Sequence, residues 1–116
     1  MRPEASSERK RRSPRVFWQV PVVMIWTGPG GLRVRERAET EIVNAHGALL
    51  RLRSPLQSGK QVELLDPRTN VTTPARVIWS AREGDTSTRA GVELAEPNET
   101  FWGLYIPVEP VLSPKP

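Results

Sequence analysis

The chain has 116 residues, of which 37% are hydrophobic, contains no cysteine, and carries a formal net charge of +4. This length suits one domain with one modest core. No stretch approaches the roughly 18 uninterrupted apolar residues of a membrane helix, so no membrane span is expected. The absence of cysteine excludes disulfides and cysteine-based metal or nucleophilic sites. Because the charged N-terminus precedes no apolar signal segment, and small secreted proteins usually carry disulfides, we expect a cytoplasmic protein.

The N-terminal segment accounts for the whole net charge. Residues 1–15 carry six basic and two acidic side chains, whereas the rest of the chain carries eleven of each sign. Residues 1–10 lack apolar periodicity and are predicted to form a disordered basic arm. Such an arm suits an anionic ligand, a nucleic-acid backbone or an acidic membrane surface, and it can equally be a solubilising tail.

Short β-type segments separated by turns follow the arm in chain order. The predicted strands cover residues 16–27, 32–43, 48–53, 61–65, 74–81 and 88–94. The glycine-rich stretch 28–31 lacks the Lys-Ser/Thr of a phosphate loop and opens a strand, so it is predicted to be a hairpin turn. With no long amphipathic helix, the pattern predicts an all-β protein, either a small barrel or a sandwich.

Alternation along two of these segments predicts which side chains face the core. In the second segment the apolar face consists of Leu32, Val34, Ala38 and Ile42. In the fifth segment it consists of Ala75, Val77 and Trp79. Trp79 is therefore expected in the core or on the flank of the barrel, and a base-stacking role is the less favoured interpretation.

The C-terminal part is predicted to close the domain. A turn at residues 96–99 is expected to hold Phe101, Trp102 and Tyr105 against the barrel, with Trp102 plugging one end. Four prolines make residues 107–116 a tail that forms neither regular helix nor strand. The predicted domain therefore spans residues 11–106.

Catalytic machinery is not evident. His46 is the only histidine, no nucleophile-elbow pattern accompanies it, and no carboxylates stand at metal-ligand spacing from it. The sequence thus predicts no catalytic residue, no metal site and no enzyme.

Two arginines before the first strand are candidates for ligand binding. Arg11 and Arg15 stand four residues apart, and Pro14 disfavours helix through the segment between them. A guanidinium group can donate two parallel hydrogen bonds to a phosphate or to the O6/N7 edge of guanine. Arg33 and Arg37 repeat the same spacing inside a predicted strand, so the spacing alone is weak.

Two further motifs strengthen this reading. The turn Asn44-Ala45-His46-Gly47 precedes Ala48-Leu49, and Gly91-Val92-Glu93-Leu94 forms the last predicted strand. In this order, the three motifs make residues 9–96 resemble the PilZ domain family.

The resemblance implies a small six-stranded antiparallel β-barrel that binds cyclic di-GMP through Arg11 and Arg15, with Arg12 as a possible supporting residue. Asn44 and His46 would add polar groups from the turn. Gly47 would let the backbone approach the ligand, since glycine permits close approach and unusual φ.

Two positions depart from the family pattern of an acid or amide followed by serine before this glycine. Ile42 stands at the acid or amide position and Asn44 at the serine position. Ile42 cannot accept a hydrogen bond from a guanine edge, and the loss of such a contact costs roughly 1–3 kcal/mol.

Three functions are therefore compatible with the sequence. The first is a PilZ-type receptor that binds cyclic di-GMP, without a further cofactor, and relays binding to an unidentified protein partner. The second is a degenerate PilZ-like interaction module that binds no nucleotide. The third is a small barrel that binds nucleic acid through its arm, against which the neutral body of the chain argues.

Overall fold

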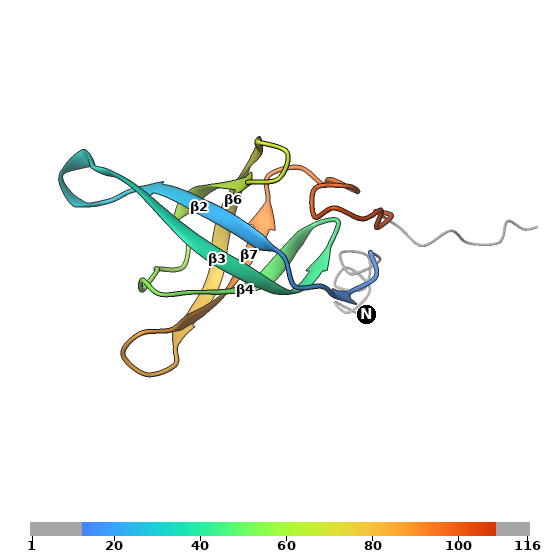
Figure 1. The fold of residues 1–116 in the computed structure, drawn as a ribbon. Helices are drawn as coiled ribbons and strands as arrows, with labels where there is room; N and C mark the ends of the chain where they lie inside the picture. Colours follow the sequence, from blue (N-terminus) through green and yellow to red (C-terminus); the bar gives the residue numbers. More distant parts are fainter. Residues whose placement is uncertain (1–12, 109–116) are drawn as a thin grey trace, which may run out of the picture.

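The computed structural model describes residues 13–108 (Figure 1). These residues form seven antiparallel β-strands joined by turns and loops, and they contain no α-helix. The strands are β1 (Val16–Phe17), β2 (Pro21–Thr27), β3 (Arg33–Asn44), β4 (Gly47–Leu52), β5 (Gln61–Asp66), β6 (Val71–Arg82) and β7 (Thr88–Leu94). Their order in the sheet is β1-β3-β2-β5-β6-β7-β4, and an additional β3–β4 pairing closes β2 to β7 into a six-stranded barrel. The predicted all-β barrel is confirmed, with β1 as an extra strand.

The segment predicted as one strand over residues 16–27 is divided into β1 and β2. Both halves pair with β3, but Thr40 of β3 interrupts the ladder between them. Its buried hydroxyl accepts a hydrogen bond from the Val20 amide at 2.9 Å and donates to the Trp18 carbonyl at 2.5 Å. Pro21, at the start of β2, has no amide hydrogen to donate. The buried Thr40 side chain of β3 therefore splits this segment. Local alternation within residues 16–27 does not reveal this contact, because it comes from another strand.

Apolar side chains from all six barrel strands fill the interior. The least exposed large ones include Val22, Met24, Val43, Leu50, Leu64 and Val77. Buried core residues recur at every second position along a strand, as Val22, Met24 and Trp26 do in β2, which is expected when one face of a strand points to the core. The core accounts for the predicted period-two patterns of the sequence.

Two β-bulges shift this alternation. Thr40 lies opposite Leu50 and Ile42 opposite Leu49, which leaves Glu41 as the extra residue of β3. Likewise Val77 lies opposite Val92 and Trp79 opposite Gly91, which leaves Ile78 as the extra residue of β6. A bulge inserts one unpaired residue and so reverses which side chains point inward.

The bulges overturn the predicted alternation at two positions, so the core position expected for Ile42 is wrong and Trp79 takes the flank, the second of its two expected places. Val43 replaces Ile42 as the buried residue of β3, and Trp79 turns to the outer flank of the barrel, where 44% of it is exposed. Leu32 was also predicted to face the core but is 70% exposed, because it lies in the β2–β3 turn at the far end of the hairpin.

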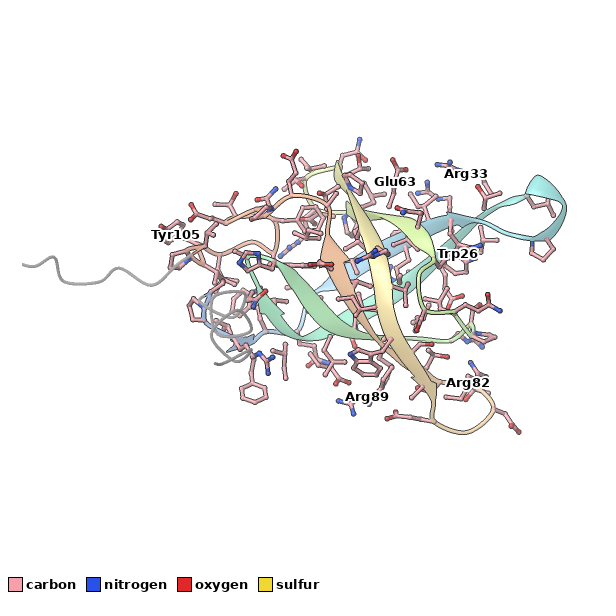
Figure 2. All side chains as sticks on the ribbon, turned by 180° about the vertical axis from the view of Figure 1, so that it is seen from behind. Trp26, Arg33, Glu63, Arg82, Arg89 and Tyr105 are labelled. Carbon is pink, nitrogen blue, oxygen red and sulfur yellow. The ribbon has the colours of Figure 1, made fainter. Side chains whose placement is uncertain are left out.

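The segment after β7 closes one end of the barrel. Phe101, Trp102 and Ile106 are buried in the main core, which confirms the predicted plugging role of Trp102. Tyr105 was predicted to pack here as well but is 64% exposed and points outward (Figure 2). Ile106 fills the place instead, its amide donating to the Glu99 carbonyl at 2.7 Å.

The two ends of the described chain lie at the same end of the barrel. The start of the described segment and residues 95–108 flank the β3–β4 turn, while the β2–β3 hairpin projects at the opposite end (Figure 1). Residues 13–108 contain no helix with the length and apolarity needed to cross a membrane. The predicted arm at residues 1–10 lies outside the described residues.

Candidate functional site

A groove of about 330 Å³ runs across the outer face of the barrel near the β3–β4 turn. Its walls come from β3, β4, β6, β7 and the chain just before β1. The lining residues include Arg15, Ile42, Asn44, His46, Gly47, Leu49, Ile78, Trp79, Gly91 and Glu93. All four of the predicted site residues that the structure describes, Arg15, Asn44, His46 and Gly47, thus line one groove. Arg11 and Arg12 lie outside the described residues.

The side chain of Asn44 holds the turn in shape. Its Oδ1 accepts hydrogen bonds from the His46 amide at 2.8 Å and the Gly47 amide at 3.0 Å. An asparagine side chain that caps amides two or three residues ahead mimics a backbone turn. The turn also rests on Trp102, whose indole Nε1 donates to the Asn44 carbonyl at 2.8 Å. Asn44 therefore shapes the groove as well as lining it.

Ser13 fastens the incoming chain to this turn. Its side chain is buried, and its Oγ accepts a hydrogen bond from the Ala45 amide at 2.9 Å. The Asn44 Nδ2 group lies 3.5 Å from the Ser13 carbonyl oxygen. Arg15 follows two residues later and is thereby held at the groove. Sequence reasoning did not identify Ser13, because a serine next to proline in a basic segment carries no sign of burial.

Gly47 is needed for packing between strands. A Cβ atom built on Gly47 would overlap the Val92 carbonyl oxygen of the adjacent strand β7. Gly47 is not among the glycines with positive φ, so the expectation of an unusual backbone conformation is wrong at this position. A glycine is needed here because β4 lies very close to β7, whereas the sequence predicted that the backbone at Gly47 approaches a ligand.

Trp79 covers Gly91 on the floor of the groove. A Cβ on Gly91 would lie 2.5 Å from Nε1 of Trp79, so only glycine leaves room for the ring. The two residues lie opposite each other on β6 and β7. Local alternation placed Trp79 on the same face as Ala75 and Val77, although the glycine in the middle of β7 was a signal that a neighbour approaches closely.

Apolar side chains form a row across the sheet through this groove. Successive pairings join Phe17 to Ile42, Ile42 to Leu49, Leu49 to Gly91, and Gly91 to Trp79. Phe17 is 85% exposed at the open end of the row. We call Phe17, Ile42, Leu49 and Trp79 the apolar row. These four side chains come from β1, β3, β4 and β6, and Gly91 of β7 lies beneath Trp79 in the same row. Isolated exposed apolar residues are ordinary, whereas neighbouring ones form a patch suited to contact with another molecule.

Charged side chains border the groove. Glu93 of the groove pairs with Arg76 at 3.2 Å, whereas Arg15 forms no ion pair with a carboxylate of residues 13–108. Among the residues that the structure describes, no carboxylate therefore offsets the positive charge of Arg15 at the groove. Arg15 can bind an anionic group without first breaking an ion pair in the described part of the chain.

An ion-pair network lies beside the groove on β3, β4 and β7. Glu41, the bulged residue of β3, forms ion pairs with Arg89 at 2.7 Å and with Arg51 at 3.0 Å. Its contact raises the pKa of Arg89 above the ordinary value for arginine. Arg51 and Arg89 lie directly opposite each other in the ladder, so Glu41 offsets a repulsion between two like charges.

A comparison with protein families matches the PilZ domain over residues 9–101. The chain belongs to the PilZ family. PilZ domains are generally associated with cyclic di-GMP binding and signalling, and they act as ligand-binding or adaptor domains rather than as enzymes. The matched segment includes Arg11, Arg12 and every residue of the groove. A comparison with curated proteins found no match. Within the described part of the PilZ domain, no three His, Cys, Asp or Glu side chains gather as a metal site would require.

Proposed function

We propose that this PilZ domain is a cyclic di-GMP receptor whose ligand lies in the groove beside the β3–β4 turn. The observation that supports the proposal is that Arg15, Asn44, His46 and Gly47 line the same groove. Arg11 and Arg12 precede the buried Ser13 by only two residues and one residue, so covalent geometry keeps their backbone within about 7 Å of Ser13 along the chain. PilZ proteins are typically cytoplasmic, and we expect this receptor in the same compartment.

Each residue has a role that follows from its chemistry. Arg15 and Arg11 would bind phosphate or the guanine O6/N7 edge through paired guanidinium donors. His46 would donate to a phosphate from the turn, and Arg12 would add positive charge. Asn44 has its Oδ1 already engaged by two amides, so its contribution is chiefly to keep the turn in shape.

Ile42 lowers the expected affinity. It lines the groove at the family's acid or amide position and offers no acceptor to the guanine edge. A missing hydrogen bond to a buried polar group weakens binding roughly tenfold to a hundredfold. Ligand binding would change the surface around the apolar row, and a protein partner would read that change.

Calorimetric titration of cyclic di-GMP tests the proposal, with the Arg11→Ala, Arg15→Ala double variant measured in parallel. We expect saturable binding by the unaltered chain and a loss of at least about tenfold in the variant, because charge-assisted hydrogen bonds are among the strongest polar contacts. Arg35→Ala is the matched control. It removes a charge from an exposed β3 position outside the groove and should leave the affinity unchanged.

Equal affinity in the double variant would refute the assigned site. The absence of heat from a folded protein at high micromolar ligand would instead favour a second function, a protein-interaction module without nucleotide binding. The apolar row, which is exposed at Phe17 and Trp79, supports this alternative, because Ile42 keeps the row apolar where the family pattern places a polar residue.

A further inference from the structure

We infer that a second groove, near the end of β4 that lies away from the β3–β4 turn, binds a phosphoryl group on a serine or threonine side chain of a partner protein. This site is separate from the one proposed for cyclic di-GMP. The second groove has a volume of about 280 Å³, and we call it the arginine groove. The polar residues that line it include Arg37, Arg51, Arg53, Thr86 and Ser87.

Two of these arginines carry positive charges that no carboxylate of residues 13–108 offsets. The β3–β4 ladder pairs Glu39 with Arg51. Arg37 and Arg53 each lie two residues beyond that pair and so point to the same outer face. Both are exposed, and neither forms an ion pair within the described chain. Like charges that face each other across a sheet are destabilising, and an anion bound between them would remove the repulsion.

The nearest carboxylates have other partners. Glu36 accepts hydrogen bonds from the backbone amides of Arg53 at 2.5 Å and Ser54 at 3.0 Å. Glu39 lines the arginine groove but accepts a hydrogen bond from the side chain of Gln19 at 3.2 Å, and it pairs with no described cation. Three arginines and one glutamate line the groove, so its net charge is positive.

Arg82 holds the two sides of the arginine groove together. Its Nη1 donates to the Arg53 carbonyl at 2.6 Å and to the Thr88 hydroxyl at 2.7 Å, and its Nη2 donates to the Asp85 carbonyl. These bonds link the end of β4 to the turn between β6 and β7, beside which Arg82 lies (Figure 2). A site that its own chain holds in place loses little conformational entropy when a ligand binds.

The lining side chains match the chemistry of a phosphoryl group. Guanidinium groups donate paired hydrogen bonds to phosphate oxygens, and the hydroxyls of Thr86 and Ser87 are further donors. A phosphorylated side chain carries a charge of about −1.5 to −2 and three acceptor oxygens. It can therefore offset Arg37 and Arg53 at the same time, whereas one carboxylate carries a single charge.

The size of the arginine groove favours a group carried by a larger partner. Pockets that enclose whole small molecules measure roughly 300–1,000 Å³, and this groove lies below that range. Nucleic-acid binders neutralise a series of phosphates, whereas this groove offers only two arginines without a described ion-pair partner. A single phosphorylated side chain fits both the volume and the charge.

A blocked tripeptide, acetyl-glycyl-phosphoseryl-glycinamide, is the probe. It is titrated into the full chain at moderate salt, and backbone amide signals are followed by NMR. We expect saturable shifts at Arg53, Thr86 and Ser87. In the Arg37→Gln, Arg53→Gln double variant the affinity should fall by at least about tenfold, because charge-assisted hydrogen bonds are lost. The tripeptide with unmodified serine should cause no such shifts.

Arg35→Gln is the matched control. Arg35 is exposed on the same face of β3, two residues from Arg37, but it does not line the arginine groove. Its loss should change the affinity by less than about twofold, since salt screens a charge outside the site.

Thermal unfolding is a second readout. Because the double variant removes two facing like charges, it should be at least as stable as the unaltered chain. Residues kept for binding commonly cost stability in this way. The phosphorylated tripeptide should raise the unfolding temperature of the unaltered chain and leave that of the double variant unchanged.

Four outcomes would overturn the inference. Equal binding by the double variant, or an equal loss in Arg35→Gln, would remove the assigned site. Shifts confined to His46 and Gly47 would place the phosphoryl group in the groove beside the β3–β4 turn. Inorganic phosphate that binds as tightly as the tripeptide would exclude a partner's side chain as the specific ligand. Single-stranded oligothymidylate that binds more tightly than the tripeptide, and loses affinity in the double variant, would assign the groove to nucleic acid. None of these measurements uses cyclic di-GMP, so the receptor function is tested separately.

Discussion

Single residues around the groove serve the barrel and the site at the same time. Asn44 caps the turn that carries His46, and Ser13 ties the N-terminal approach to that turn. Gly47 lets β4 lie against the Val92 carbonyl of β7. The shape of the groove therefore depends on residues whose main contacts are within the protein, and a substitution there affects stability as well as the shape of the groove.

Gly47→Ala tests the contribution of a groove residue to stability, at the position where an added side chain has the least space. The added Cβ would overlap a backbone carbonyl, which cannot rotate away, so we expect the free energy of unfolding to fall by about 1–3 kcal/mol or more. Urea denaturation measures the change. Gly28→Ala is the control, because its Cβ would meet the end of the Val34 side chain at 3.1 Å and would lie at an ordinary contact distance of 3.6 Å from the Leu32 carbonyl oxygen. Its cost should be below about 0.5 kcal/mol. A Gly47→Ala protein as stable as the control would show that the β4–β7 contact relaxes freely.

At the scale of the strands, two bulges create the candidate site. The extra residues Glu41 and Ile78 reverse the alternation of β3 and β6, and the reversal brings Ile42 and Trp79 to the outer face. Without the bulges both side chains would point into the core, as the sequence predicts. Bulges often occur next to binding sites, where they redirect a side chain.

The strands and turns were largely predictable, whereas the bulges were not. Composition, alternation and turn signals located the six barrel strands, although β1 and β2 were joined in one segment, and the glycines located the 28–31 and 44–47 turns, because these signals are local. A bulge arises from the pairing of two strands distant in the sequence, so no local pattern reports it. The motif residues Asn44, His46 and Gly47 were found by resemblance, but the exposure of Trp79 required the pairing register. The burial of Ser13 likewise depends on a turn more than thirty positions away.

The segment after β7 is an element of the core without being a strand. A chain shortened to end at Leu94 would lose Phe101, Trp102 and Ile106, all of them buried. Removal of one large buried aromatic residue costs about 3–5 kcal/mol, and whole domains are stable by only about 5–15 kcal/mol. We therefore expect no cooperative thermal unfolding from this shortened chain. A chain that ends at Val108 should unfold cooperatively, as the full chain does. Cooperative unfolding of the chain that ends at Leu94 would mean that the barrel folds without its plug.

At the scale of the whole molecule, polar contacts connect the ends of the barrel wall to the plug. Arg68 binds the buried carboxylate of Asp66 through Nε at 3.0 Å, and also reaches the Trp102 carbonyl at 3.3 Å. Trp18 donates to the same carbonyl. Burial alone would raise the pKa of Asp66, but hydrogen bonds from the side chain and backbone of Arg68, together with its positive charge, lower the pKa below the ordinary value.

This depressed pKa predicts acid sensitivity. A carboxyl group whose pKa is lower in the folded chain than in the unfolded chain, where it is about 3.9, stabilises the fold when ionised. Its contribution is complete above that value and is lost as the pH falls through the folded-state pKa. Urea midpoints measured from pH 7 down to pH 2.5 should therefore fall more steeply for the unaltered chain than for Asp66→Asn. Parallel curves for the two proteins would show that Asp66 does not contribute to the acid response.

The β2–β3 hairpin offers a point of attachment remote from the groove. Its tip, a short 3₁₀ turn at Pro29–Gly31, projects from the barrel at the end opposite the β3–β4 turn (Figure 1). Gly30 and Gly31 adopt positive φ there, and a side chain added to either would meet no neighbouring atom. Exposed loop tips of this kind tolerate insertions. A biotin-acceptor peptide placed between these two glycines would let the protein be immobilised by its hairpin, with the candidate groove beside the β3–β4 turn facing the solution and any partner that it carries.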